Sequence, residues 1–268
     1  MSGLAGFLLN INSNESDRSL MPSSVSPELK MVEIEINHHC NRACSYCPNS
    51  VAERIEQGEM EPALFEKIMQ QLVEINYKGS ISYMFYNEPL LSKDLNRFVQ
   101  MTRQYLPTND IHLYTNGTLL TLDKFRALYK DGVTRFFVTK HEGVKNYVFD
   151  KVYEELNENE KFAVLFKSFR DLKLTNRGGA VKAGPPEPVQ LTACFIPQFL
   201  AVITVLGNVL PCFEDFHEKN IMGNVGETHL RDIWMNQKFQ NFRQSLKLGL
   251  RHTQDPCDKC NRTQVCHS

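Results

Sequence analysis

The chain has 268 residues, of which 42% are hydrophobic, and its 30 basic residues nearly balance its 31 acidic residues. A chain of this length can bury one substantial core and a small second lobe, and it has no apolar run near the roughly 20 residues that cross a bilayer. The near-zero net charge argues against nucleic acid bound through the whole surface, and the opening residues lack the pattern of a secretory signal. We therefore expect a cytoplasmic protein that acts on a small molecule and binds neither nucleic acid nor a membrane.

Residues 1–30 are rich in Ser, Asn and Pro without any period, and we expect a loosely ordered extension there. Beyond them, segments that alternate apolar and polar residues, as strands do, are interleaved with segments that are apolar at helical spacing. The predicted strands are residues 30–37, 80–86, 111–115 and 134–140, and the predicted helices are residues 62–75, 95–106 and 121–132, the last closed by Gly132. This alternation predicts an α/β fold with a parallel sheet, either doubly wound or a full or partial (β/α) barrel.

A stretch dense in Gly and Pro, residues 176–189, marks a connection. We therefore divide the chain into a barrel, residues 31–185, and a smaller carboxyl-terminal domain, residues 186–268. In the second part, residues 199–213 have the pattern of a β-hairpin.

The hairpin turn contains Gly207 and Asn208, which both tolerate positive φ. Residues 228–250 follow with helical periodicity, and Thr228 is a suitable N-cap. The apolar stripe of this helix, which we expect to be core, consists of Leu230, Ile233, Trp234, Phe242 and Leu246.

The chain contains eight cysteines, and thiols inside cells are kept reduced, so a disulfide framework is not expected. They are Cys40, Cys44, Cys47, Cys194, Cys212, Cys257, Cys260 and Cys266. The first three fall within residues 38–50, HHCNRACSYCPNS, directly after the first predicted strand, where a dinucleotide-binding protein would carry G-x-G-x-x-G. The distribution predicts two metal or redox sites, the first at the mouth of the barrel.

Two interpretations of the first three cysteines are open. A structural zinc site takes four ligands, and His38 or His39 could supply the fourth. A four-iron cluster held by only three thiolates would instead leave one iron free to bind an exchangeable ligand.

The motif C-N-R-A-C-S-Y-C, read as C-x-x-x-C-x-aromatic-C, resembles that of the radical S-adenosylmethionine (SAM) superfamily. The resemblance implies a partial (β/α) barrel in which Cys40, Cys44 and Cys47 bind a 4Fe-4S cluster whose open iron chelates SAM. It also implies cosubstrate-binding roles for Tyr46, at the adenine, and for Glu88, at the methionine amino group, together with Asn87 and Asn116. The stretch Y-N-E-P, residues 86–89, departs from the glycine-glycine-glutamate pattern of the family at Tyr86 and Asn87.

The later cysteines resemble those of an auxiliary cluster domain of this superfamily, the Twitch domain. The resemblance implies that four of them hold a second 4Fe-4S cluster, namely Cys194, Cys212, Cys257 and Cys260. The C-x-x-C pair alone could also bind zinc.

Longer segments, including LTNRGG and AVITVLGNVLPCFEDF, resemble radical SAM dehydrogenases of aminoglycoside biosynthesis. The resemblance implies oxidation of a secondary alcohol of an aminocyclitol, of the 2-deoxy-scyllo-inosamine kind, with the second cluster as electron acceptor and a flavodoxin- or ferredoxin-type electron donor. Arg177 and Tyr114 would be catalytic, and Phe213 would line the substrate pocket with them. Because a guanidinium stays protonated, Arg177 is expected to bind hydroxyls rather than act as a base.

Cys266 leaves two further interpretations open. It is either an idle thiol near the chain end or a hydrogen-atom donor, and the latter role would make the protein an epimerase of an aminoglycoside or sugar. A more remote alternative is a zinc-stabilised binding protein without catalysis.

Overall fold

The computed structural model describes residues 28–263 except residues 55–56, 146 and 186–191. Most of the predicted extension and Cys266 therefore lie outside the described residues. Among the described residues, no helix has the length and apolar character to cross a membrane.

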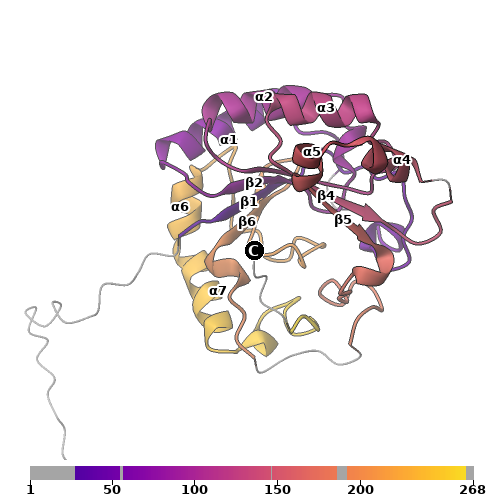
Figure 1. The fold of residues 1–268 in the computed structure, drawn as a ribbon. Helices are drawn as coiled ribbons and strands as arrows, with labels where there is room; N and C mark the ends of the chain where they lie inside the picture. The colour runs from indigo at the N-terminus through magenta and orange to yellow at the C-terminus, as the bar shows by residue number, and fades with distance from the viewer. Residues whose placement is uncertain (1–27, 55–56, 146, 186–191, 264–268) are drawn as a thin grey trace, which may run out of the picture.

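One eight-stranded sheet organises the described residues, with the strand order β5-β4-β3-β2-β1-β6-β7-β8. The strands are β1 Met31–Ile34, β2 Ser80–Tyr83, β3 Ile111–Thr115, β4 Arg135–Lys140, β5 Val164–Ser168, β6 Leu200–Ile203, β7 Asn208–Leu210 and β8 Gly223–Asn224. Strands β1 to β6 run parallel, and β7 and β8 are added antiparallel. The sheet curves with helices outside it (Figure 1), which is the predicted partial barrel.

The helices form the outer layer. They are α1 Pro62–Glu74, α2 Leu95–Tyr105, α3 Leu122–Asp131, α4 Val148–Glu155, α5 Glu158–Phe162, α6 Leu230–Met235 and α7 Gln237–Lys247, with 3-10 turns at Pro48–Ser50, Pro89–Leu91, Phe169–Asp171, Ile196–Gln198 and Arg251–Thr253. Figure 1 shows α1, α2 and α3 side by side, and α6 and α7 continue this layer beside α1. Local signals set the bounds: Thr121 caps α3 by accepting from the Lys124 N–H, and Gly132 ends it at φ 123°.

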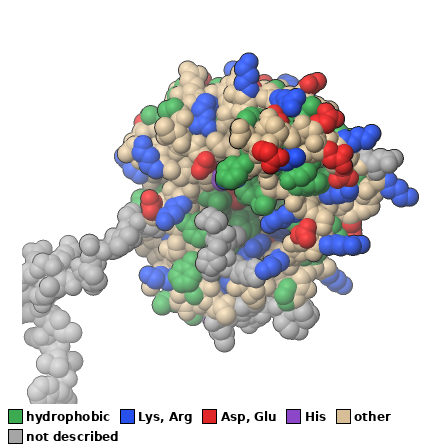
Figure 2. All heavy atoms as spheres, viewed as in Figure 1, with side chains coloured by type: hydrophobic (Ala, Val, Ile, Leu, Met, Phe, Trp, Pro, Cys, Tyr) green, Lys and Arg blue, Asp and Glu red, His purple; other side chains and the backbone are tan. Residues whose placement is uncertain are grey.

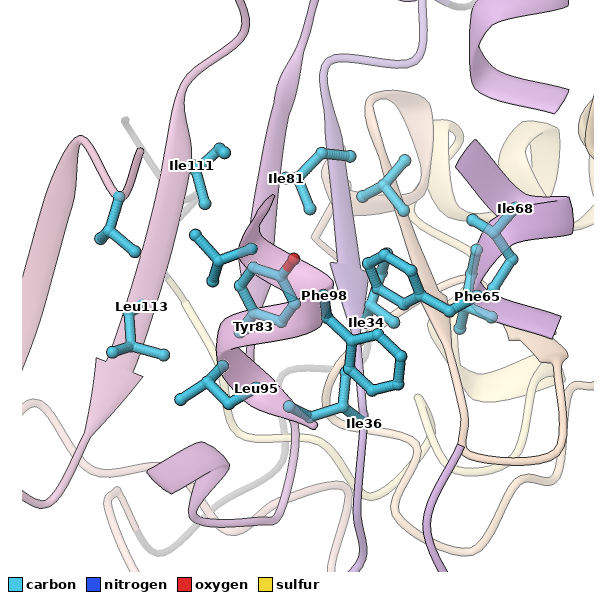
Figure 3. Packing of buried hydrophobic residues seen from close by; sticks show 14 of the residues in the cluster. Ile34, Ile36, Phe65, Ile68, Ile81, Tyr83, Leu95, Phe98, Ile111 and Leu113 are labelled. Atoms are coloured by element: carbon cyan, nitrogen blue, oxygen red, sulfur yellow. The ribbon is translucent and has the colours of Figure 1, made fainter. Parts of the chain in front are cut away.

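The main core lies between the outer helices and the sheet. Figure 3 shows Phe65 and Ile68 of α1 and Phe98 of α2 packed against Ile34 and other side chains that point outward from the strands. The face of the molecule viewed in Figure 1 is hollowed near its centre, where hydrophobic side chains gather (Figure 2).

The hairpin predicted at residues 199–213 is confirmed, because β6 and β7 pair antiparallel with Val202 opposite Leu210. Gly207 takes positive φ (89°), whereas Asn208 begins β7 without it. Strand β6 also pairs in parallel with β1, with Met31 opposite Leu200, so the sheet continues across the predicted domain boundary. The division at residue 185 stays a prediction.

A second, smaller apolar cluster lies on the inner face of β1 and β6. Its buried members are Ile196, Leu200, Val202 and Leu210. Cys194, Cys212 and Phe213 pack against this cluster. The cysteine-bearing segments of the carboxyl-terminal part are therefore fixed against the inner face of the barrel.

The single helix predicted at residues 228–250 is wrong, because the segment forms two helices, α6 and α7. Asn236 has extended backbone (φ −68°, ψ 158°) between α6 and α7 and accepts from the Phe239 N–H as the N-cap of α7. Asn competes with helical hydrogen bonding in this way, which explains the break. The N-cap of α6 is His229 rather than Thr228. The predicted apolar stripe, including Trp234, is buried as expected.

Buried carboxyl groups occupy the inner face of β1. Val32 and Ile34 belong to the outer core, so the alternation of a strand turns Glu33 and Glu35 inward. Glu35 accepts from buried Arg54 (Nη2 to Oε2 2.6 Å). Glu33 is only 2% exposed, and burial raises its pKa to about 8 although Arg177 lowers it.

Stability should therefore fall as pH rises between about 4.5 and 8, because the folded chain keeps a proton on Glu33 that the unfolded chain releases. The loss amounts to at most about 1.4 kcal/mol per pH unit for this group. The Glu33→Gln variant lacks this titration. The difference between its melting temperature and that of the wild type should therefore shift in favour of the variant as the pH rises from about 5.5 to about 8.5. Melting curves at several pH values measure this, with exposed Glu158→Gln as control. A constant difference across the range would contradict the assignment.

Candidate active site

One cavity at the carboxyl ends of β1 to β4 brings the predicted non-cluster site residues together. Its volume is about 210 Å³. Its lining includes Cys40, Cys44, Cys47, Tyr46, Asn87, Glu88, Tyr114, Asn116, Arg177 and Phe213. These residues are separated by up to 173 positions, from Cys40 to Phe213, and strand-end loops of a parallel barrel meet in this manner. Their individual roles stay predictions.

The three amino-terminal cysteines lie in one loop that lines this cavity. The Cys47 N–H donates to Cys44 O (3.0 Å), and the Ser50 N–H donates to Cys47 O (3.0 Å). Burial raises the pKa of the Cys47 thiol, which the Asn49 N–H and Arg177 lower. Bound metal ionises such a thiol outright, so this loop fits a cationic cluster.

The histidines beside this loop have other partners. The Gly58 N–H donates to His38 Nδ1 (2.6 Å). The rings of His38 and His39 lie 3.8 Å apart, and both side chains line a different cavity. Within the part of the chain that the structure describes, no three His, Cys, Asp or Glu side chains come close enough to hold a single metal ion.

Glu88 is held rigidly at the carboxyl side of β2. It is 1% exposed, and its carboxylate accepts from the Asn116 N–H (2.7 Å), Thr115 Oγ1 (2.8 Å) and the Leu90 N–H (3.0 Å). Burial raises the pKa of Glu88, and these hydrogen bonds lower it. The carboxylate is thereby pre-organised to receive a cation from the cavity.

The two asparagines predicted at the site orient the loops around Glu88. Asn87 Nδ2 donates to Asn37 Oδ1 (2.7 Å), and Asn37 Nδ2 in turn donates to Glu88 O (3.1 Å). Asn116 Nδ2 donates to Asn41 Oδ1 (2.8 Å) in the cysteine loop. The loops after β1, β2 and β3 are therefore linked by side-chain hydrogen bonds.

Tyr86 explains why this chain has no glycine at that position. Its ring is buried 5.0 Å from the Phe216 ring, and its hydroxyl donates to Phe213 O (2.8 Å). The side chain thus connects the end of β2 to the segment that follows Cys212. The departure from the family pattern adds a contact between the two parts of the chain.

Tyr46 has a partner that the sequence did not indicate. Its hydroxyl pairs with His141 Nδ1, and its ring lies 5.1 Å from Phe169. Burial and Arg42 lower the pKa of His141 to about 4, so the imidazole is neutral near pH 7. His141 directly follows β4, and the rule that strand ends face the site was the signal that could have identified it.

Tyr114 and Arg177 both line the cavity. The Tyr114 ring stacks on Phe137 (4.3 Å, 4° between planes). Arg177 lies in the turn after residue 175 with positive φ (51°), and its Nη1 is 3.7 Å from Glu214 Oε1. The next residue is necessarily small, because a Cβ on Gly178 would lie 2.8 Å from Glu214 O.

Glu214 is a second residue that the sequence did not single out. It is 3% exposed and accepts from Thr175 Oγ1 (2.9 Å) and from Arg262 Nε (2.8 Å) in addition to its ion pair with Arg177. Its place two residues after Cys212 was the available signal.

The four later cysteines line one further cavity together, as expected for ligands of one group. They are Cys194, Cys212, Cys257 and Cys260. Burial raises the pKa of Cys260 to about 11 and that of Cys212 well above its usual value. The Glu214 N–H donates to Cys212 Sγ (3.4 Å) and the Arg262 N–H to Cys260 Sγ (3.5 Å). Such N–H to sulfur bonds stabilise cluster thiolates, so this site fits an iron-sulfur cluster.

Residues 34–175 match the family model of the Radical SAM superfamily, and residues 194–261 match that of SPASM, an iron-sulfur cluster-binding domain. The chain belongs to the radical SAM superfamily, which confirms the predicted family and fold, and it is a radical SAM enzyme.

Its similarity to one curated protein is more specific. The S-adenosyl-L-methionine-dependent 2-deoxy-scyllo-inosamine dehydrogenase of Niallia circulans is 48% identical over 235 residues, 88% of this chain and 94% of the relative. A crystal structure of BtrN in complex with AdoMet and 2-DOIA has a TM-score of 0.84 at 47% identity, with 88% of this chain and 94% of that chain covered. BtrN in an open conformation has a TM-score of 0.72 at 41% identity, with the same coverage.

Iron content tests the two cysteine sets separately. Anaerobically reconstituted protein should hold about eight irons, and the Cys257→Ala/Cys260→Ala variant about four, because each four-iron cluster needs its thiolates. Replacing Cys40, Cys44 and Cys47 by Ala should remove the other four irons, those of the first cluster. Cys266→Ala is the control and should retain all iron. Loss of iron from this control would show that the second ligand set is wrong.

Proposed function

We propose that this radical SAM enzyme oxidises a secondary alcohol of an aminocyclitol, 2-deoxy-scyllo-inosamine or a close analogue, to a ketone. Its cofactors are SAM and two 4Fe-4S clusters. One observation carries the proposal: a single cavity joins the three-cysteine loop to Glu88 and to Arg177. The 48% identity to a dehydrogenase of this name, and the neighbour with AdoMet and 2-DOIA, support the substrate class.

When bound, the cofactors supply one-electron chemistry, which removes a hydrogen atom from carbon and accepts a further electron. The rest of the oxidation is the departure of the hydroxyl proton. In this chain, Arg177 faces the cavity with up to five N–H donors. Burial favours its neutral form, but Tyr86 and Glu214 keep the pKa of Arg177 above its usual value. Arg177 therefore binds a substrate oxygen and favours the alkoxide, without acting as base.

Glu88 lies beside the cysteine loop, because its N–H donates to His39 O (2.7 Å). Its carboxylate is suited to the ammonium group of SAM because it is buried, already oriented by hydrogen bonds, and able to accept from a cation. Asn87 and Asn116 fix the loops around it. Tyr46 presents its ring for the adenine while His141 holds its hydroxyl.

Aromatic side chains also line this cavity. They are Tyr114 and Phe137, whose rings stack on each other, and Phe213, which directly follows Cys212. An apolar wall excludes water from the reacting carbon, which limits side reactions of radical species. The flavodoxin- or ferredoxin-type donor and the cytoplasmic location stay predictions.

The direct test is product mass. Reduced enzyme incubated with SAM and 2-deoxy-scyllo-inosamine should form a ketone that lacks two hydrogens of the substrate. A product of unchanged mass with one inverted centre would establish the epimerase instead, and Cys266→Ala would then abolish it. No conversion of any aminocyclitol would overturn the proposal.

Arg177→Ala should lower ketone formation by about tenfold to a hundredfold, because a charged hydrogen bond to the substrate is lost. The dissociation constant of SAM should change much less than ketone formation, because the ammonium group of SAM is assigned to Glu88 and not to Arg177. Exposed Arg170→Ala is the matched control. Wild-type turnover in Arg177→Ala would eliminate the assigned role.

Tyr46→Phe and His141→Ala should each raise the dissociation constant of SAM several-fold, because both remove the hydroxyl-imidazole contact that orients the Tyr46 ring. The double variant should bind SAM about as well as either single variant, since the contact can be lost only once. Equilibrium binding measures this, with exposed His252→Ala as control. Additive losses would mean that the two side chains act independently.

A further inference from the structure

Arg262 lies between the two cavities and contacts the walls of both. Its side chain lines the cavity of the four later cysteines. Its Nε donates to Glu214 Oε1 (2.8 Å), and its guanidinium lies 4.8 Å from the centre of the Phe213 ring. Phe213 and Arg177, the other partner of Glu214, line the first cavity.

Arg262 and Glu214 each lie directly beside one cysteine of the second site. Glu214 follows Cys212 by two residues and donates its N–H to that sulfur, and Arg262 stands in the same relation to Cys260. The ion pair between their side chains therefore joins the segments that follow two of the four cysteines. Arg262 is also anchored on its other side, because Arg251 Nη1 donates to Arg262 O (2.8 Å).

The charges of Arg262 and Glu214 have opposite effects on the reduction potential of the second cluster. A cluster with four thiolates becomes more negative when it takes an electron, so a nearby cation makes reduction easier and a nearby anion makes it harder. Glu214 is the anion, at 3% exposure, and Arg262 is its nearest cation at 2.8 Å, against 3.7 Å for Arg177. Low solvent exposure strengthens both effects.

We propose that Arg262 is a positioning residue that couples the substrate cavity to the second cluster. It holds the Glu214 carboxylate against Arg177, and its positive charge makes the cluster a better electron acceptor. The coupling part rests on the proposed function, whereas the effect on the cluster does not depend on which alcohol is oxidised.

The reduction potential of the second cluster tests the electrostatic part without substrate. It is measured by EPR-monitored titration of the full chain carrying Cys40→Ala, Cys44→Ala and Cys47→Ala, so that only the second cluster is present. Arg262→Gln should make the potential more negative, Glu214→Gln should make it less negative, and Arg262→Lys should stay near wild type. Exposed Arg231→Gln is the control. Absence of a shift in both Gln variants, or shifts of the same sign, would overturn the proposal.

The ratio of ketone to 5′-deoxyadenosine in the holoenzyme tests the positioning part. Arg262→Lys keeps the charge but loses the planar fork, so this ratio should fall by about tenfold while cosubstrate cleavage continues. A wild-type ratio in Arg262→Lys would refute the positioning role.

If Arg262→Gln failed to retain iron, the opposite shift of the reduction potential expected in Glu214→Gln would still decide the electrostatic part. If no aminocyclitol were oxidised, only the proposed function would fail.

Discussion

The parallel pairing of β6 with β1 is the constraint on which the site depends. It joins residues about 170 positions apart, with Met31 opposite Leu200 and Ile34 opposite Ile203. Strand β1 leads into the first cysteine loop, and the β6–β7 hairpin lies between Cys194 and Cys212 in the sequence. Without this register, the two sets of thiols would have no fixed relation, and Arg177 and Phe213 would not face Glu88 across one cavity.

Much of this arrangement could be predicted because its signals are local. The spacing of Cys40, Cys44 and Cys47 fits one loop, and the strand-helix alternation predicted the barrel, so the rule that strand ends face the site placed this loop at the barrel mouth. Glu88 was predicted only from the resemblance to the radical SAM superfamily. The break at Asn236 was missed because a capping side chain can interrupt an amphipathic pattern without changing its period. The predicted elements left out β5, an edge strand in which every residue is exposed or half-buried, so its sequence shows no buried face.

The missed site residues share one physical reason: they acquire their roles from distant partners. Glu214 meets Thr175 across 39 positions, Arg262 meets Glu214 across 48, and Tyr46 meets His141 across 95. No periodicity or spacing rule reports such contacts. Tyr86 is a related case, since the sequence revealed only a departure from a glycine pattern, while the structure gave the hydroxyl a defined acceptor at Phe213 O.

The two sets of thiols differ in their shelter from solvent, and this difference has a consequence for the chemistry of damage. Cys40 is exposed, although Cys44 beside it is buried, whereas the four described later cysteines are all half-buried or buried. Dioxygen consequently has the shorter route to the amino-terminal cluster, which must stay accessible for its ligand to exchange. The vulnerability to air is thus inherent in a cluster that is held by only three thiolates, whereas the second site, which four cysteines line, can be enclosed.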